Sequence, residues 1–318
     1  MTRSLLRWVY PPLMLVGFNG VAIALVAAGQ AHALLGGLLL VAIATSFAVE
    51  RLIPYDPDWN APHDDVDRDI AHALVNESFA LGSVLALPAL AGMATIADVW
   101  PGRLPFVAQV LGTILVFDFG ITIAHWLSHR WGPLWRLHAV HHSVKRSYGL
   151  NGLMKHPLHQ AVELSFGIAP LLVIGIPQQV AWALAFAVAI QLLMQHSNAD
   201  YRVGPLRGWL SLNEGHRFHH LKWGGIGDVN FGLFTLIYDR LLLKTFSYDP
   251  HKRFTSDDLG IAAEPDFPAG YVDQLLKPVR GRRSRQAERP ELRITAASEW
   301  VPARAAPADA TSAERSRR

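Results

Sequence analysis

The residues of this sequence whose types and spacing could do chemistry are its histidines. Eleven of the fifteen histidines lie between His125 and His220. Nine of them form an HxxxH cluster, an HxxHH cluster, a single His and a second HxxHH cluster, namely His125, His129, His138, His141, His142, His196, His216, His219 and His220. Spacings of three and four residues place side chains on one face of a helix, so each cluster can present its imidazoles to one point. The pattern therefore predicts a metal site.

The ligand types narrow the choice of metal. The sequence contains no cysteine, which excludes disulfides, thiolate-bound zinc, iron–sulfur clusters and thiol nucleophiles. Nine imidazoles are too many for one zinc ion with four ligands, but they suit two ions with four or five nitrogens each. Imidazole binds iron, copper, nickel and zinc, and iron of higher coordination would use ligands that a tetrahedral zinc pair leaves idle. We predict two Fe ions, with O2 as co-substrate.

A histidine by itself is more often packed or hydrogen-bonded in a fold than bound to a metal. We interpret His32, His63, His72 and His251 in this way. Chance does not account for three clusters of the HxxxH or HxxHH type within one short stretch, together with His196 in an uncharged segment.

The segments that would position these clusters are apolar, with 51% hydrophobic and 17% charged residues in the chain. The uncharged run 8–49, interrupted only near Gly29 and His32, predicts a helical hairpin. A secretory signal is the alternative, but a second apolar run follows directly. Runs 79–97 and 104–131 predict a third and a fourth crossing. The uncharged run 164–199, broken by prolines and glycine, is either a further pair of crossings or a re-entrant hairpin.

We predict an all-α, polytopic membrane protein with four transmembrane helices plus a short helical hairpin, and a His-rich helical cap on the cytosolic side. The expected divisions are a transmembrane hairpin (1–49), a membrane di-iron domain (50–250) and a C-terminal extension (251–318). Arg3 and Arg7 predict a cytoplasmic N-terminus. Two hairpins then return the chain to that side, so the clusters should face the cytoplasm, at a bacterial inner membrane or its equivalent.

The positive charge of the chain belongs to its C-terminal tail. From Lys277 onward the sequence has eleven Lys or Arg and five Asp or Glu, a net charge of +6, so the preceding residues carry −3 of the overall +3. We predict that the tail is disordered from about residue 277. We expect the tail to be a solvated arm or to contact an anionic membrane surface. We expect no nucleic-acid partner.

The order of the clusters resembles the fatty acid hydroxylase/sterol desaturase superfamily of integral-membrane di-iron oxygenases. Further features of the resemblance are Asp118 before the first cluster, Arg130, His156-Pro157-Leu158, Asn230-Phe231-Gly232 and Asp239-Arg240. The resemblance covers roughly residues 50–245 and implies that the nine clustered histidines bind the metal. It implies hydroxylation of a lipid, on an acyl chain, a sterol-like ring or a polar head group such as that of ornithine lipids. Desaturation and ether-lipid cleavage lie within the range of the superfamily.

Five residues near the clusters are candidates for supporting roles. Some relatives carry a further His at the position of Asp200, which could be a ligand, an orienting partner of His196 or a helix-end residue; we favour the orienting role. His156, in a turn with His159, is an extra ligand or an orienting group. Asp118 lies two turns before His125 on the same face and should pair with an imidazole N–H. Asp228 and Asn230 bond ligand imidazoles or form a turn.

Electrons must come from elsewhere, because the sequence has no GxGxxG fingerprint, no cysteine and no segment like cytochrome b5. We predict a separate ferredoxin or cytochrome, docked on a basic surface around Lys145-Arg146 and Arg217–Lys222, although such charges also contact lipid headgroups. A metal-ion transporter is the alternative function, and it would need ligands near the middle of the membrane. Haem binding is a further alternative, but it would need only axial His pairs and would leave most of the nine histidines unexplained.

Overall fold

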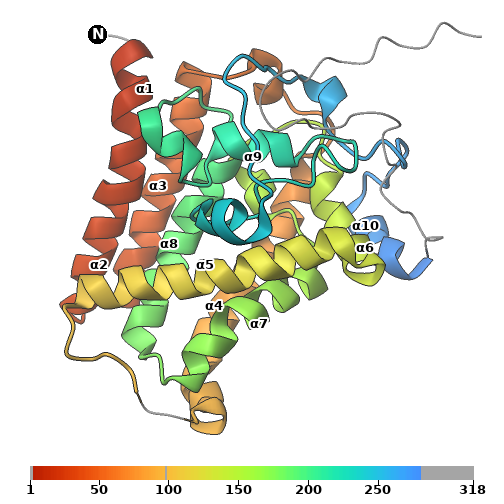
Figure 1. Cartoon of the computed structure of the whole chain (residues 1–318). Helices are drawn as coiled ribbons and strands as arrows, with labels where there is room; N and C mark the ends of the chain where they lie inside the picture. Colours follow the sequence, from red (N-terminus) through yellow and green to blue (C-terminus); the bar gives the residue numbers. More distant parts are fainter. Residues whose placement is uncertain (1–2, 97–98, 281–318) are drawn as a thin grey trace, which may run out of the picture. The chain divides into compact units, whose positions relative to one another are not determined.

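The structure is a computed structural model, and it describes residues 3–96 and 99–280 (Figure 1). Every regular element in these two ranges is helical, which confirms the predicted all-α class for this part of the chain. The N-terminal helix consists of α1 (Arg3–Pro12), the π-helical η1 (Leu13–Phe18) and α2 (Asn19–Ala27). Pro11 and Pro12 lie inside it, and because proline lacks an N–H, the regular bonding pattern shifts to a π-helix directly after them. α3 (His32–Leu52) returns beside this helix.

Seven longer helices follow in the described residues. They are α4 (Val66–Ala94), α5 (Phe106–Arg130), α6 (Gly132–His142), α7 (Pro157–Val173), α8 (Gln178–His196), α9 (Asn213–His219) and α10 (Tyr271–Arg280). Short helical turns connect them, namely η2 (Pro57–Asn60), η3 (Gly149–Leu153), η4 (Gly204–Gly208), η5 (Asp239–Leu243) and η6 (Ser256–Asp258).

Five helices are long and apolar enough to cross a membrane: Arg3–Ala27, His32–Leu52, α4, α5 and α8. They include the predicted hairpin and the predicted third and fourth crossings. In the ambiguous run 164–199, α8 has the length of a span. The preceding α7 continues through Pro170 and ends at Val173, where Gly175 adopts a φ of 83° and turns the chain toward α8. The helices indicate an integral membrane protein.

Several helix ends meet at the end of the molecule that carries the histidines. Arg7 of α1 lies 2.8 Å from the carboxylate of Asp200, four residues beyond His196. The backbone N–H of Tyr55, after α3, donates to the carbonyl of Asn198. The N-terminal end of α1, the C-terminal end of α3 and the C-terminal end of α8 are therefore on the same side as the histidine clusters.

The helix that carries the first two histidines, α5, is held against α7 by a very close backbone approach. A Cβ atom added to Gly120 would lie 2.1 Å from the carbonyl oxygen of Phe166, and one added to Gly167 would lie 2.6 Å from the ring of Phe117. Small residues allow membrane helices to approach in this way and gain packing along their length. The Gly120–Gly167 crossing therefore sets where His125 and His129 lie.

Two arginines of the predicted basic docking surface are buried, which corrects that prediction. Arg146 is 3% exposed and forms two hydrogen bonds of 2.7 Å to Asp65. Burial alone would raise the pKa of Asp65, but the hydrogen bonds and charge of Arg146 lower this pKa below its ordinary value. Arg217 is 5% exposed, donates to the carbonyl of Ser197 and lies 3.7 Å from the ring centroid of Tyr55. Both arginines hold the fold together and offer little charge to a partner.

The described part of the predicted C-terminal extension is tied to the helical body. Gln274 of α10 is fully buried, and its side-chain oxygen lies 2.9 Å from Nε2 of His72 on α4. Residues 277–280 form the last turn of α10, so the expected start of disorder at about 277 does not hold for them. The remainder of the basic tail, 281–318, lies outside the described residues.

Candidate metal centre

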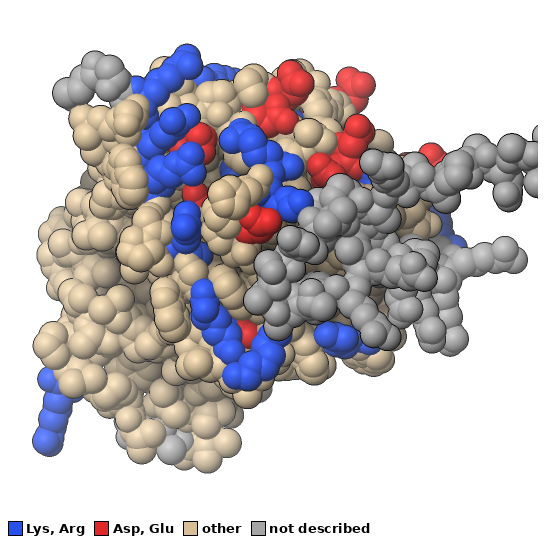
Figure 2. Space-filling model, turned by 45° about the horizontal axis from the view of Figure 1, so that its top comes forward, with Lys and Arg blue, Asp and Glu red and all other residues tan. Residues whose placement is uncertain are grey.

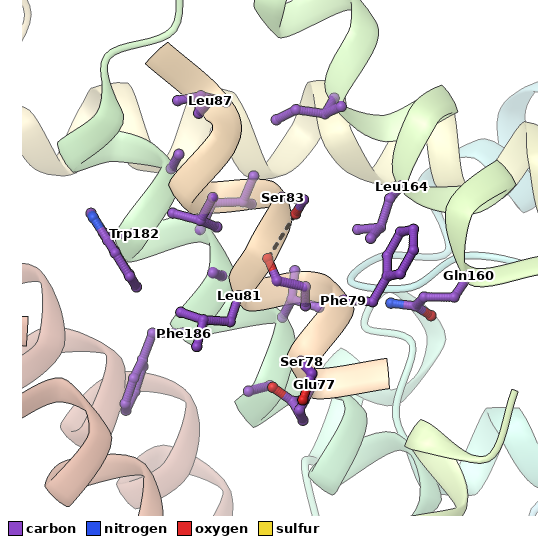
Figure 3. A pocket seen from close by; sticks show the side chains of 18 of the residues that line it. Glu77, Ser78, Phe79, Leu81, Ser83, Leu87, Gln160, Leu164, Trp182 and Phe186 are labelled. Carbon is purple, nitrogen blue, oxygen red and sulfur yellow. Dashed lines mark hydrogen bonds between the residues drawn. The ribbon is translucent and has the colours of Figure 1, made fainter. Parts of the chain in front are cut away.

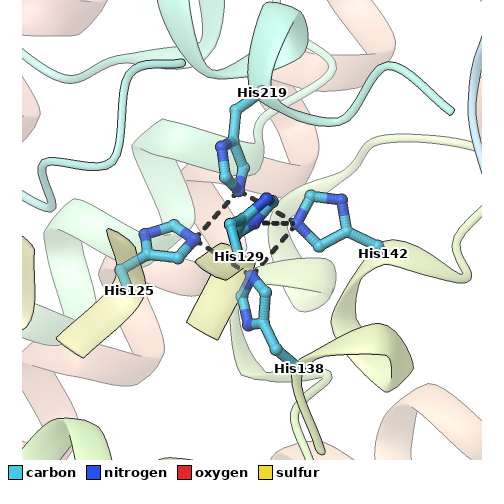
Figure 4. A group of neighbouring side chains, drawn as sticks. All are labelled: His125, His129, His138, His142 and His219. Carbon is cyan, nitrogen blue, oxygen red and sulfur yellow. Dashed lines mark hydrogen bonds between the residues drawn. The ribbon is translucent and has the colours of Figure 1, made fainter. Parts of the chain in front are cut away.

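Five imidazoles from three helices converge at one point (Figure 4). This first group consists of His125 and His129 at the end of α5, His138 and His142 of α6, and His219 of α9. Nε2 of His219 lies 2.9 Å from Nε2 of His125 and 3.0 Å from Nε2 of His142. Nε2 of His142 lies 3.0 Å from that of His138 and 3.2 Å from that of His129. All five ring nitrogens therefore face a common centre.

The other four clustered histidines form a second group, His141, His196, His216 and His220. Nε2 of His216 lies 3.0 Å from Nε2 of both His196 and His220, and the Nε2 atoms of His141 and His196 are 3.3 Å apart. His141 and His142 are neighbours in the sequence, but their rings belong to different groups. The nine histidines singled out by their spacing are thus all brought together, five in one group and four in the other.

The spacing of the ring nitrogens fits a metal ion at the centre of each group. Nitrogens that bind one ion at about 2.1 Å and at right angles to each other lie about 3.0 Å apart, which matches the separations between the Nε2 atoms. Five of the rings place Nδ1 within hydrogen-bond distance of an outer oxygen, so Nδ1 carries the proton and the Nε2 lone pair points inward. Lone pairs that face each other repel unless a cation lies between them.

One short segment orients three of the five imidazoles of the first group. Nδ1 of His129 donates to the carboxylate of Asp228 over 2.8 Å, which is one of the two roles considered for this residue. Nδ1 of His219 donates to the carbonyl of Val229 and Nδ1 of His125 to that of Phe231, both over 2.8 Å. Residues 228–231 are therefore the outer support of this group. The acceptors of His219 and His125 are backbone carbonyl groups, which every residue has. The sequence therefore could not have predicted these two contacts.

The clustered histidines outside the spanning helices are held neutral. Burial, and to a smaller extent the surrounding histidines, lower the pKa of six of them well below the ordinary value: His138, His141, His142, His216, His219 and His220. Neutral imidazole is the form that binds a metal, so these side chains need not lose a proton at pH 7 before they can bind one.

Comparison with known proteins identifies the family to which this arrangement belongs. Residues 110–244, which include all nine clustered histidines, match the fatty acid hydroxylase family. The chain is also 32% identical over 265 residues to the ornithine lipid hydroxylase OlsE of Rhizobium tropici, an alignment that covers 80% of this chain and 78% of the relative. No solved structure gives a significant match.

The chain belongs to the fatty acid hydroxylase family. This confirms the resemblance seen in the order of the histidine clusters. Two predicted supporting roles need correction in this member of the family. Asp200 does not contact His196 but forms an ion pair with Arg7, at 2.8 Å. His156 stands at the N-terminus of α7, where its Nδ1 accepts from the N–H of Leu158, and it belongs to neither group.

Asp118 and Asn230 support the site indirectly: Asp118 does not bond an imidazole as predicted, and Asn230 takes the second of its two predicted roles, in a turn. The carboxylate of Asp118 accepts hydrogen bonds from the backbone N–H groups of residues 233–235 and from the hydroxyl of Thr235, at 2.7 to 2.9 Å. Asn230, at a φ of 57°, bonds the backbone of Gly215 and Ser247. Both residues therefore fix the chain on either side of Phe231, whose carbonyl orients His125.

Three further residues at the site were not predicted. Asp239 accepts from the N–H groups of Phe231 and Gly232 at 2.7 and 2.9 Å, and its place in the Asp239-Arg240 pair was the signal that could have identified it. Trp135 is buried, with its ring centroid 5.2 Å from that of His129. Glu163 binds Lys155 at 2.5 Å and faces His159.

His159, whose role the sequence does not define, lies beside the first group. Its ring centroid is 4.5 Å from that of His138, and its Nε2 lies 2.9 Å from the hydroxyl of Ser128. Its Nδ1 is buried 3.8 Å from the carboxylate of Glu163. Glu163 and His138 complete a small third cluster with it.

Replacing Asp228 with asparagine should weaken metal binding at the first group by about 10- to 100-fold. The amide keeps the shape of the side chain but not the charge that accepts the proton of His129. Equilibrium titration of the purified protein with Fe(II) in the presence of a competing chelator would measure this. Asp249→Asn, in a turn away from both groups, is the control; equal affinities in the two variants would contradict the assigned role.

Proposed function

We propose that this protein is an O2-dependent hydroxylase of a membrane lipid, with one iron in each group of imidazoles. The observation that carries the proposal is the convergence of nine Nε2 atoms into two groups with metal-ligand spacing, within a chain of the fatty acid hydroxylase family. The iron pair would supply the redox chemistry that activates O2. The overall reaction is R–H + O2 + 2e⁻ + 2H⁺ → R–OH + H2O.

The residues of the chain have three tasks in this reaction. The inward Nε2 atoms hold the metal, and the support from residues 228–231 keeps the rings of the first group oriented before the metal binds. Trp135 and Phe231 pack against the rings of His129 and His125, at centroid distances of 5.2 and 5.4 Å, and exclude water from that side. The second group has four imidazoles against five in the first, so a metal held there would have fewer protein ligands.

We propose an aminoacyl lipid of the ornithine type as the substrate. The relative that spans most of this chain is named for the hydroxylation of ornithine lipid. The five candidate spans indicate a membrane protein, which suits a lipid substrate. Lipid mass spectrometry, described below, distinguishes head-group hydroxylation from acyl-chain hydroxylation and from desaturation.

We propose that the histidine groups face the cytoplasm, where Arg3 and Arg7 would lie under the positive-inside tendency, and that a separate ferredoxin or cytochrome delivers the electrons. Charged side chains gather over one part of the surface in Figure 2, next to a broad uncharged area. Lys145 is exposed and Lys222 partly exposed. With Arg146 and Arg217 buried, these two lysines are what remains of the proposed docking site.

Transport of a metal ion is less well supported. A transporter would place its ligands near the middle of the membrane. Here His125 and His129 occupy the last turns of α5, His196 is the last residue of α8, and the other six histidines lie in or beside α6 and α9, outside the candidate spans.

Metal analysis and lipid mass spectrometry test the proposal together. The protein purified in detergent should contain about two irons per chain, one for each group of imidazoles. Cells that express it should gain a lipid heavier by one oxygen, and fragmentation should place that oxygen on the head group. Zinc without iron, or an unchanged lipid profile, would refute the proposal; loss of two hydrogens would identify a desaturase.

A further inference from the structure

A cavity of about 640 Å³ lies between α3, α4, α7 and α8. Its wall is mostly apolar, with Leu, Ile, Val, Ala and Phe side chains and Trp182 (Figure 3). On α4 the lining residues run from Leu74 to Leu90, a distance of about 24 Å along a helix. A cavity of this length and composition, among membrane-spanning helices, suits one acyl chain.

One end of the cavity lies against the second histidine group. Leu153 and Leu192 line the cavity, and the carbonyl of Leu192 accepts from Nδ1 of His196. A methyl group added to Gly152 would lie 3.0 Å from Nδ1 of His196. Met154, next to Leu153, accepts from Nδ1 of His141. A single layer of residues therefore separates this end of the cavity from the group with four imidazoles.

The polar side chains at this end are Glu77, Ser78 and Gln160 (Figure 3). The turn of α4 that carries Glu77 is fixed there, because the amide of Asn76 donates to the carbonyls of Leu153 and Lys155 at 2.7 and 2.9 Å. The opposite stretch of α4, toward Leu87 and Leu90, adds only apolar side chains to the wall. The acidic side chain of the wall thus lies next to the histidine groups, and away from them His32, Ser83 and Ser165 are the polar members of an otherwise mostly apolar wall.

Glu77 is an acidic residue in a membrane-spanning helix, and such residues are costly unless something pairs with them. Among the described residues, no Lys, Arg or His forms an ion pair with its carboxylate and no donor hydrogen-bonds to it. The buried acids Asp65, Asp69 and Glu163 each have a cationic partner within 2.7 Å. Glu77 differs from these three, and its carboxylate faces the cavity.

We propose that the cavity binds the acyl chain of the substrate and that Glu77 binds a cationic amine in its head group. The inference rests on the proposed function and adds the residue that recognises the substrate: Glu77 selects a lipid with a free amine near the end that is oxidised. The amine supplies the missing partner of Glu77. It also places the head-group end, and not the methyl end of the chain, beside the second histidine group.

The test compares the binding of two lipids to the iron-loaded protein under nitrogen, where no turnover occurs. One is an ornithine lipid, and the other is the same lipid with its free amine acetylated. The wild-type protein should bind the amine lipid about 10- to 100-fold more tightly, the range expected for a charge-assisted hydrogen bond. Glu77→Gln should bind both lipids alike. Asp67→Asn, which removes an exposed charge from the first turn of α4, should keep the preference.

Equal binding of the two lipids by the wild-type protein would overturn the inference without any variant, so a folding defect in Glu77→Gln cannot conceal the answer. A preference retained by Glu77→Gln would overturn it as well. If air and a chemical reductant then yield hydroxylated lipid although no preference was found, the proposed function stands and only the role of Glu77 fails. If the preference is found but air and the reductant yield no product, the binding inference stands and the proposed hydroxylation fails.

Discussion

Replacing His219 with alanine is expected to abolish hydroxylation and to lower the iron content to one ion per chain or fewer. Its Nε2 lies 2.9 Å from that of His125 and 3.0 Å from that of His142, so it joins α5 to α6 in the first group. Its Nδ1 is anchored on the carbonyl of Val229. Alanine removes a ligand and leaves a gap that opens this group to water. Iron analysis of the purified variant and the mass of the lipids in expressing cells would measure both effects.

His251→Ala is the matched control for this variant. His251 is exposed and lies outside both histidine groups, so its removal should leave iron and product at wild-type levels. An unchanged lipid product in His219→Ala, together with full iron content, would remove His219 from the site.

Replacing Gly120 with alanine is expected to prevent α5 from packing on α7. The added methyl group would stand 2.1 Å from the carbonyl oxygen of Phe166 and 2.8 Å from Cα of Gly167, and both of these atoms belong to the backbone and cannot rotate away. The helices must separate, which costs about 3 kcal/mol or more. Heating the detergent-solubilised protein and measuring the soluble fraction by size-exclusion chromatography should show a large fall in the midpoint temperature.

Gly112→Ala provides a control on the same helix. A Cβ atom at Gly112 would meet nothing within 4 Å, and alanine is favoured over glycine inside helices, so this variant should be at least as stable as the wild type. Equal midpoints for the two variants would show that α5 and α7 can adjust, and that the Gly120–Gly167 crossing does not position the site.

The sequence predicts the spanning helices well where charge marks their ends, and poorly between α7 and α8. A proline such as Pro170 is expected to break the uncharged run, but α7 continues through it to Val173. Neighbouring helices can satisfy the groups that a proline leaves unbonded in a membrane helix. The chain instead turns at Gly175, where a positive φ ends the helix.

The nine clustered histidines could be predicted because helical spacing is a local property, whereas their division into two groups depends on how the helices pack. In each HxxHH cluster the two residues four apart share a group: His138 with His142, and His216 with His220. The third member, His141 or His219, faces the other group. The backbone partners of Asp118 and the closest partner of Asp200, Arg7, could not be predicted, because they lie more than 100 residues away in sequence and only the tertiary fold brings them close.

The support of the first group by residues 228–231 has a consequence for how the protein is made. His125 and His129 enter the membrane with α5 about a hundred residues before Asp228 and Phe231 leave the ribosome. Until then, neither ring has its outer acceptor, and His219 is not yet present to complete the group. We therefore expect iron to be inserted after translation is complete and all the spans are in place, so that a nascent chain stalled before residue 228 would hold no metal in its first group.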